Sequence, residues 1–320
     1  SSAGIVANCS GKSGGLIYTF DRCQNNGEVT GNGILGGITA VQGATAGNNV
    51  CHYIQCVNNG DITATATQAV SSSAMAGIAA FYSPGSVFEY CINTGFVTNT
   101  KSVYTAGIAA NNKGSATADY PVVFKGCVNT GNIASSAQQI AGIVAYITNY
   151  TSVDSCLNYG TIEQGIWGAA GICYTMAGTT SSLTNCINYG DVSVTQYNAG
   201  GIVGNCASTT AVIENCVNVG NITSTTTAEK NNYGVGGIAG SSYATMKNCF
   251  NAGKVVGKLR VGGIVGSPSY YAKVARTQLV NCVNVGLITA DEGCGGALVG
   301  TTKGEGEKYW GDNNSCTNSY

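Results

Sequence analysis

Apolar and polar positions follow one another in the same order many times along this chain. Each copy has an apolar residue three positions before a cysteine, mainly polar residues next, and an isoleucine or valine six positions after the cysteine. The shared pattern is CxNxGx[IV], and a shortened copy, CTNSY, begins at Cys316. The full copies begin at Cys23, Cys56, Cys91, Cys127, Cys156, Cys186, Cys216, Cys249 and Cys282. Successive copies lie 29 to 36 residues apart, which predicts a repeat architecture.

A second motif alternates with the first and has a nearly constant isoleucine at its centre. Its copies are AGIVA at 3, GGITA at 36, AGIAA at 76 and 106, AGIVA at 141, AGICY at 170, GGIVG at 200, GGIAG at 236, GGIVG at 262 and the altered GGALVG at 295. We therefore interpret residues 1–320 as a single repeat domain of about ten units, each of about 33 residues. The final unit, at about 295–320, is a variant of the others.

The composition favours strands joined by tight turns. Glycine occurs 47 times and proline 3 times, and no long amphipathic helix is visible. A unit this short cannot bury an apolar face alone, so it stacks on its copies and each motif position becomes a column. We predict an all-β parallel solenoid, with a right-handed β-helix as the favoured form and a length of about 45 to 50 Å. An extended antiparallel meander or curved sheet of the same repeats is the alternative that the pattern leaves open.

Two columns of this stack carry recognisable chemistry. The asparagine two residues after each motif cysteine, as in Asn58, Asn129, Asn188 and Asn218, is predicted to satisfy its amide along a ladder of identical neighbours. The glycine two residues later supplies a positive φ or a tight corner. The motif cysteines are expected to face inward as small apolar side chains and to stay reduced, because in-register thiols meet the disulfide dihedral poorly.

The second motif gives the chain a resemblance to a known family. The segments GIVG at 201 and 263 and GIAG at 237 resemble the short motif of GLUG-type repeats. This resemblance extends over essentially the whole chain, although several copies have alanine in place of the closing glycine. It implies a β-solenoid array in a secreted or cell-surface microbial protein, often adhesin-like, and it brings no catalytic residues.

Five further cysteines lie outside the motif column. They are Cys9, Cys51, Cys173, Cys206 and Cys294. The total of 15 cysteines is odd, so at least one thiol is free or paired between chains. The start at SSAG, without a charged and then apolar leader, favours a mature exported protein. In such a protein, unpaired surface thiols at these five positions are candidates for cross-linking between subunits.

The remaining chemistry is sparse, and we predict no enzyme activity, cofactor or metal site. His52 is the only histidine, and it is adjacent to Cys51 on an expected strand, where the two side chains point to opposite faces. Acidic and basic residues share the position two before the cysteine and form an expected solvated ladder, at Asp21, Glu89, Lys125, Asp154, Glu214 and Lys247. A net charge of −1 argues against nucleic-acid partners, and no apolar stretch is long enough to span a membrane. Tyr309 and Trp310, in the charged segment 303–314, are candidate interface residues.

These observations favour a structural function outside the cell. Neither end of the sequence shows a polar cap, so a stack of this kind can continue into a neighbour, head to tail or laterally. We expect an extracellular protein that self-assembles by strand pairing into a filament, surface layer or sheath, with disulfides as possible cross-links. The alternative is a cell-surface adhesin or carbohydrate-binding β-helical rod that contacts cell-surface polysaccharide. A polysaccharide lyase or hydrolase ranks third, because clustered carboxylates are absent from the pattern.

Overall fold

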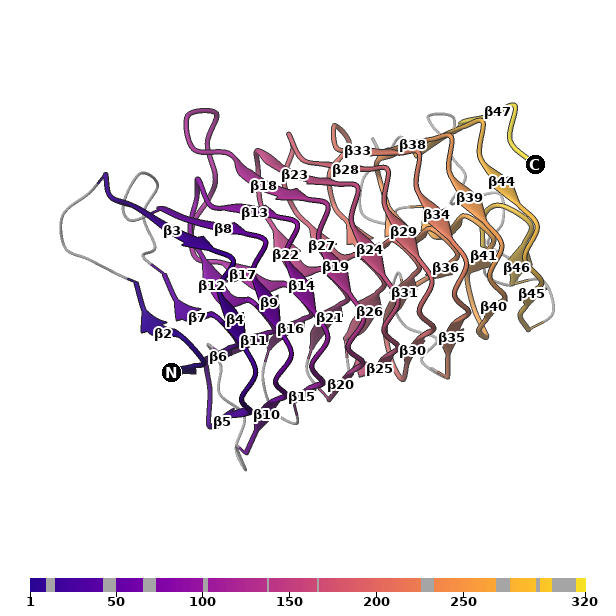
Figure 1. The fold of residues 1–320 in the computed structure, drawn as a ribbon. Coiled ribbons are helices and arrows are strands. Elements are labelled where there is room, and N and C mark those ends of the chain that lie inside the picture. Colours follow the sequence, from indigo (N-terminus) through magenta and orange to yellow (C-terminus); the bar gives the residue numbers. More distant parts are fainter. Residues whose placement is uncertain are drawn as a thin grey trace.

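The chain forms one elongated stack of short parallel strands (Figure 1). The structure is a computed structural model and describes residues 1–9, 15–42, 50–65, 73–99, 103–136, 138–165, 167–225, 233–268, 277–291, 294–300 and 315–320. These residues contain no helix, and all strand pairs among them are parallel. The prediction of a parallel β-solenoid is confirmed, and the antiparallel meander is wrong.

Each coil of the stack contributes to five sheets in turn, and sheets 1 and 2 hold the glycine-rich motif. Sheet 1 consists of β1 (Ser2–Ala3), β6 (Leu35–Gly36), β11 (Ala74–Ala76), β16 (Tyr104–Ala106), β21 (Gln139–Ala141), β26 (Gly168–Ala170), β31 (Asn198–Gly200), β36 (Val235–Gly236), β41 (Val261–Gly262) and β46 (Gly295–Gly296). Sheet 2 consists of β2 (Val6–Asn8), β7 (Thr39–Val41), β12 (Ala79–Tyr82), β17 (Ala109–Asn112), β22 (Val144–Ile147), β27 (Cys173–Met176), β32 (Val203–Cys206), β37 (Ala239–Ser242) and β42 (Val265–Pro268).

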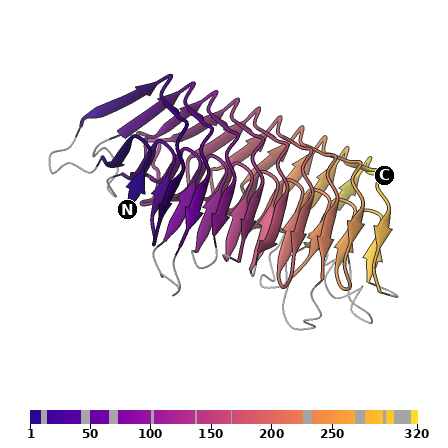
Figure 2. The same ribbon diagram turned by 60° about the horizontal axis from the view of Figure 1, so that its bottom comes forward.

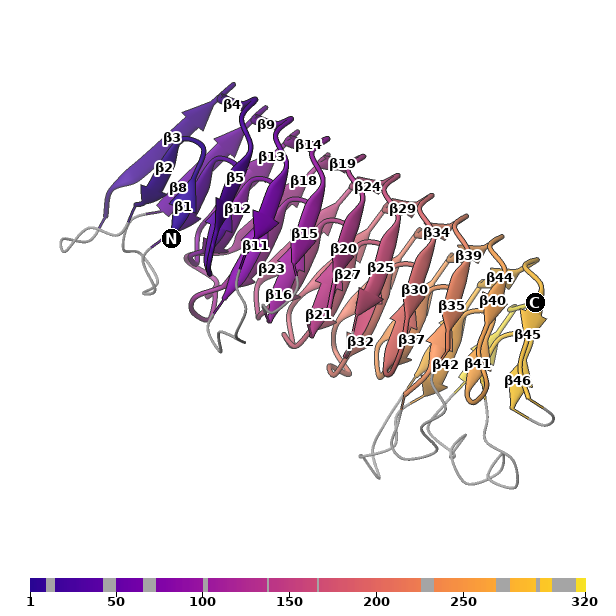
Figure 3. The same ribbon diagram turned by 90° about the horizontal axis from the view of Figure 1, so that it is seen from below.

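The cysteine motif lies at the passage from sheet 3 to sheet 4. Sheet 3 consists of β3 (Ile17–Asp21), β8 (Val50–Ile54), β13 (Val87–Glu89), β18 (Val122–Lys125), β23 (Thr151–Asp154), β28 (Ser182–Thr184), β33 (Val212–Glu214), β38 (Thr245–Lys247), β43 (Gln278–Val280) and β47 (Ser315–Thr317). Sheet 4 consists of β4 (Gln24–Asn25), β9 (Val57–Asn58), β14 (Ile92–Asn93), β19 (Val128–Asn129), β24 (Leu157–Asn158), β29 (Ile187–Asn188), β34 (Val217–Asn218), β39 (Phe250–Asn251) and β44 (Val283–Asn284). Its two-residue strands follow one another along one edge of the stack in Figure 3.

Sheet 5 completes each coil before the chain returns to sheet 1. It consists of β5 (Val29–Gly31), β10 (Ile62–Ala64), β15 (Val97–Asn99), β20 (Ile133–Ser135), β25 (Ile162–Gly165), β30 (Val192–Val194), β35 (Ile222–Ser224), β40 (Val255–Val256) and β45 (Ile288–Thr289). The isoleucine or valine six residues after the cysteine begins nearly every one of these strands, which gives that motif position its structural role.

The coil encloses two large apolar interiors, and smaller apolar clusters lie between sheets 1 and 2, such as that of Ala76, Phe81 and Ala110. The larger interior lies between sheets 2, 3 and 4 and includes Tyr82, Phe88 and Cys91. The smaller interior lies between sheets 1 and 5 and includes Leu35 and Ile62. Sheets 1 and 2 pack against each other. A strand of sheet 1 also contacts the strand of sheet 2 in the neighbouring coil, as β31 contacts β37. Figure 2 shows the coils repeating this arrangement along the stack.

Small residues of the second motif make the contact between sheets 1 and 2 possible. A Cβ added to Gly200 would lie 2.0 Å from the Val203 carbonyl oxygen and 2.9 Å from the Gly240 nitrogen. Since real Cβ atoms do not approach backbone so closely, the two sheets can pack at this distance at Gly200 only because that residue has no Cβ. The second motif therefore allows close packing where the chain passes from sheet 1 to sheet 2.

Side chains of one motif position lie above one another, as the column argument predicts. The rings of Phe20, Tyr53, Phe88 and Phe124 stack in succession, with centroids 4.6 to 5.2 Å apart. The central isoleucines of the second motif are fully buried from Ile38 to Ile264, whereas Ile5 in the first coil is exposed. Each internal coil thus buries the apolar face of its neighbours.

Candidate functional site

The asparagines of the cysteine motif form a directional hydrogen-bond ladder inside the stack. The side-chain nitrogen Nδ2 of each donates to Oδ1 of the asparagine in the next coil, at 2.7 to 2.8 Å from Asn25 through to Asn284. Each Nδ2 also donates to the carbonyl of the glycine two residues later, as Asn158 does to Gly160 at 2.9 Å. Asn58, Asn129, Asn188 and Asn218 are fully buried members of this ladder. The predicted ladder is confirmed.

The motif cysteines form a second internal column. From Cys56 to Cys282 they are buried, and most donate their thiol hydrogen to a backbone carbonyl of the preceding coil. The Sγ atom of Cys127, for example, lies 3.4 Å from the Phe88 oxygen. Cys23 is half-buried, and Cys316 is exposed at the last coil. These thiols act as small apolar side chains that also satisfy a carbonyl.

The positive-φ residue lies directly before the motif, five residues earlier than the glycine at which the sequence indicates it. The residue just before each cysteine has a positive φ, between 52° and 62°, at Arg22, Gln55, Tyr90, Gly126, Ser155, Asn185, Asn215, Asn248 and Asn281. The motif glycines have no positive φ but pack tightly, since a Cβ on Gly160 would lie 2.1 Å from the Gly131 oxygen. Of the two predicted roles for that glycine, close packing is right and positive φ is wrong. The last four turn residues are asparagines, a residue type that tolerates this conformation.

The five cysteines outside the column are not surface groups. Cys9, Cys51, Cys173, Cys206 and Cys294 are all buried, so the expectation of surface thiols that cross-link subunits is wrong at these positions. Cys51, Cys173 and Cys206 lie in strands with their side chains turned inward, and burial raises the pKa of Cys173 and brings that of Cys206 to about 11. Among the described residues, Cys316 is the one exposed thiol.

The charged ladder lies on the outer face of sheet 3. Its residues are mostly paired in strand register, without ion pairs between their side chains. Glu89 lies beside Lys125, and Lys125 beside Asp154. Within the described ranges, the single ion pair joins Arg22 to the adjacent Asp21 at 2.9 Å, and both side chains are exposed. Burial opposes ionisation of Asp154, but hydrogen bonds from Thr184 and its neighbours outweigh it and lower the pKa of that carboxyl. His52 faces outward and its neighbour Cys51 inward, so the two do not form a catalytic pair.

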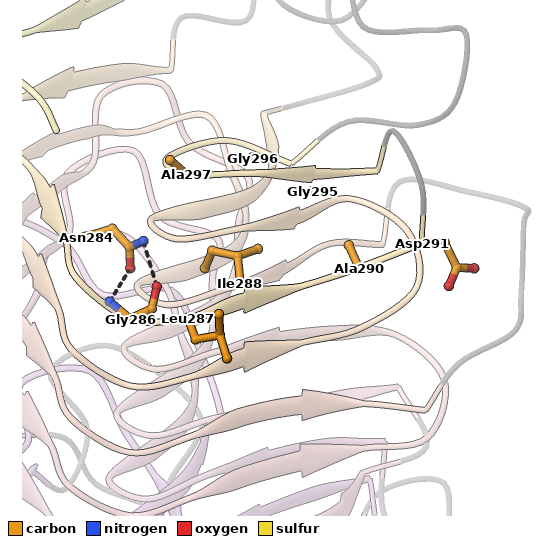
Figure 4. Close-up of a pocket in the computed structure, with 9 residues that line it drawn as sticks. All are labelled: Asn284, Gly286, Leu287, Ile288, Ala290, Asp291, Gly295, Gly296 and Ala297. Atoms are coloured by element: carbon orange, nitrogen blue, oxygen red, sulfur yellow. Dashed lines mark hydrogen bonds between the residues drawn. The ribbon is translucent and has the colours of Figure 1, made fainter.

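The last coil leaves a hollow at the end of the smaller interior (Figure 4). Its volume is about 540 Å³, and its lining comes from the chain around β44, β45 and β46: Asn284, Gly286, Leu287, Ile288, Ala290, Asp291, Gly295, Gly296 and Ala297. Ile288 is only partly buried here, although it continues the column of Ile62, Ile222 and Val255, which is buried in earlier coils through stacking. The hollow therefore has the apolar floor on which a further strand of sheet 5 would stack.

The two ends of the asparagine ladder differ in hydrogen-bonding character. At the last coil, Nδ2 of Asn284 donates to the Gly286 carbonyl at 3.1 Å, and no next asparagine receives its second hydrogen among the described residues. At the first coil, Oδ1 of Asn25 accepts from the Gly27 nitrogen at 3.3 Å instead of from a preceding asparagine. One end thus presents a donor and the other an acceptor.

Other functional features do not gather at a site. No group of three or more metal-ligating side chains occurs in the described part of the chain. Tyr309 and Trp310 lie outside the described residues. None of the described segments forms a helix that could cross a membrane. Comparisons with protein-family models, with curated proteins and with solved structures found no match to this chain.

Proposed function

We propose that this chain is an extracellular structural protein whose solenoids join by strand pairing into a filament, surface layer or sheath. The observation that carries the proposal is the polarity of the asparagine ladder, with an acceptor at Asn25 and a donor at Asn284. Two copies stacked head to tail, with Tyr320 displaced from its backbone hydrogen bonds to Cys282 and Asn284, would bring these groups together. The same stacking would add strands to the open sheets and cover the apolar hollow. The resemblance to GLUG-type repeats supports a location outside the cell.

Such an interface is heterologous, so each copy that binds leaves a fresh end of the same kind. A donor end cannot pair with another donor end, which favours growth in one direction over closed dimers. Most of the interface energy would come from apolar burial over Ile288 and Ala290, while the amide and strand hydrogen bonds would set the register.

Electron microscopy of the purified full chain tests this proposal. We expect filaments, tubes or sheets for the unchanged chain, and short rods for Ile288→Lys, because a charge would then be placed on the apolar floor of the covered hollow. Val219→Lys is the matched control, since Val219 is an exposed apolar residue on the side of the stack. Samples with and without reductant, run also on non-reducing gels, show whether the exposed Cys316 contributes a covalent link.

Isolated rods of about 5 nm for the unchanged chain, with or without reductant, would contradict self-assembly and leave the adhesin-like rod as the better explanation. Assemblies that survive Ile288→Lys but are lost with Val219→Lys would show lateral contacts instead of end-to-end stacking. Each result assigns the interface to a different face of the same molecule.

A further inference from the structure

Cys9 and Cys51 meet inside the first two coils. Cys9 directly follows β2 in the first coil, and Cys51 lies in β8 of the second. Both belong to the larger apolar interior, where Cys9 is 8% exposed and Cys51 fully buried. The Cys51 thiol donates to the Cys9 sulfur and thereby lowers the pKa of Cys9, while the same contact raises that of Cys51.

The repeat geometry places these two positions in contact independently of the thiols. Asn8 pairs with Val41 and His52 with Val87, so Gln42 and Ser86 occupy the places of Cys9 and Cys51 one coil further on. Oγ of Ser86 lies 3.0 Å from Oε1 of Gln42.

The same two positions meet again near the other end of the stack. There they are held by Ser242 and Thr277, since Cys206 pairs with Ser242 and Thr245 with Gln278. Oγ1 of Thr277 lies 2.6 Å from the Ser242 carbonyl oxygen. The two positions are thus neighbours at two further places along the stack.

We propose that Cys9 and Cys51 form an intramolecular disulfide that fastens the first coil to the second. Cys9 follows β2 and Cys51 lies in β8, so the two side chains are not held in the parallel register that meets the disulfide dihedral poorly. The motif cysteines instead lie in parallel register, and each that donates to a carbonyl already has a partner. The proposed extracellular location supplies the oxidant. The contact between Cys9 and Cys51 does not depend on that location.

The proposed oxidation is a thiol–disulfide exchange with a small-molecule disulfide, glutathione disulfide. The Cys9 thiolate attacks one sulfur of glutathione disulfide, the S–S bond of that reagent breaks, and one glutathione thiolate leaves. Cys51 then loses its proton and attacks the Cys9 sulfur of the mixed disulfide, which releases the second glutathione. In total, two protein thiols are oxidised to one disulfide and one glutathione disulfide is reduced to two glutathione thiols. The residual exposure of Cys9 makes it the first to react.

The test uses the full chain with Cys316→Ser, so that the exposed thiol does not link copies. The protein is treated with glutathione disulfide, unfolded and alkylated, and its intact mass is measured. We expect two fewer alkylated cysteines than in the reduced protein and a Cys9–Cys51 linked peptide after digestion. Adding Cys9→Ser or Cys51→Ser should abolish this loss of two, and Cys173→Ser should not change it.

A gain-of-function variant separates the proposal from any folding defect. Cys206 contacts the backbone of Ala244, which holds the Cys51 position in the eighth coil. Ala244→Cys should therefore create a second disulfide, with four fewer alkylated cysteines. A folded, oxidised protein that keeps all its thiols, or that links other cysteines, would overturn the proposal. Because these measurements are made on dilute single chains, their outcome is independent of whether the protein forms filaments.

Discussion

Replacing Asn158 by alanine tests whether the buried amide ladder holds the coils together. Asn158 is fully buried in β24 at the middle of the stack. Its side chain accepts from Nδ2 of Asn129 at 2.8 Å and donates to Oδ1 of Asn188 at 2.8 Å and to the Gly160 carbonyl at 2.9 Å. The alanine variant loses all three hydrogen bonds and leaves three polar groups without these partners in an interior that excludes water.

The expected cost follows from those three groups. An unsatisfied buried polar group costs about 1 to 3 kcal/mol, and the space vacated by the amide adds to this. Partial relaxation of the coil reduces the total, so we expect Asn158→Ala to lower the free energy of unfolding by about 3 to 6 kcal/mol. The value is large because native domains have only about 5 to 15 kcal/mol of stability.

Urea denaturation followed by circular dichroism measures this loss. The control is Asn185→Gly, which removes an exposed asparagine of the outer turn ladder, where Nδ2 donates to Asp154 at 2.7 Å. Asn185 has a positive φ that glycine adopts readily, and water replaces its hydrogen bonds, so the control should cost less than about 1 kcal/mol. Equal losses for the two variants would refute the claim that the internal ladder carries the stability.

Two other predictions concern packing and pH. Gly160→Ala should lower stability by about 2 kcal/mol or more, because its Cβ would meet the Gly131 oxygen at 2.1 Å, whereas Gly33→Ala has open space and should be nearly neutral in the same urea assay. Asp154, whose native pKa is lowered, contributes stability that is complete above its unfolded value of about 4 and is lost as the pH falls through the native value. Asp154→Asn should therefore reduce the acid-side slope of stability between about pH 4 and 2, and an unchanged slope would refute this assignment.

The sequence predicts the columns of this fold but not the full cross-section. Asn158 and its equivalents recur at one position with one residue type, so both their burial and their ladder follow from the pattern. The positive-φ position before each cysteine has no such signal, because residues as different as Arg22, Tyr90 and Ser155 occupy it. All of them are exposed or nearly so, and only their backbone is constrained.

The second apolar interior and the burial of the five cysteines outside the motif column were also beyond sequence reasoning. A pattern shows that a position is buried, but it does not show which sheet covers it. Gly200 and its equivalents are typical of turns as well as of close sheet contacts, and only the structure shows sheet 1 against sheet 2. Cys9 and Cys51 belong to different columns, so their contact depends on the offset between two sheets, which no single column reveals.

The ladder also explains how coils of unequal length keep one register. Asn93 and Asn129 are 36 residues apart, and Asn129 and Asn158 only 29, yet both donor–acceptor distances are 2.8 Å. Most of the difference lies between sheets 2 and 3, where nine residues join β17 to β18 but three join β22 to β23.

A slip by one residue would turn each asparagine outward and bring a side chain of the outer face into the interior. A slip by two would keep the strand pattern but leave the buried amides without partners, at about 1 to 3 kcal/mol for each unsatisfied group. The asparagine column sets the register of each coil on the next. The connections between strands can therefore vary in length without changing that register.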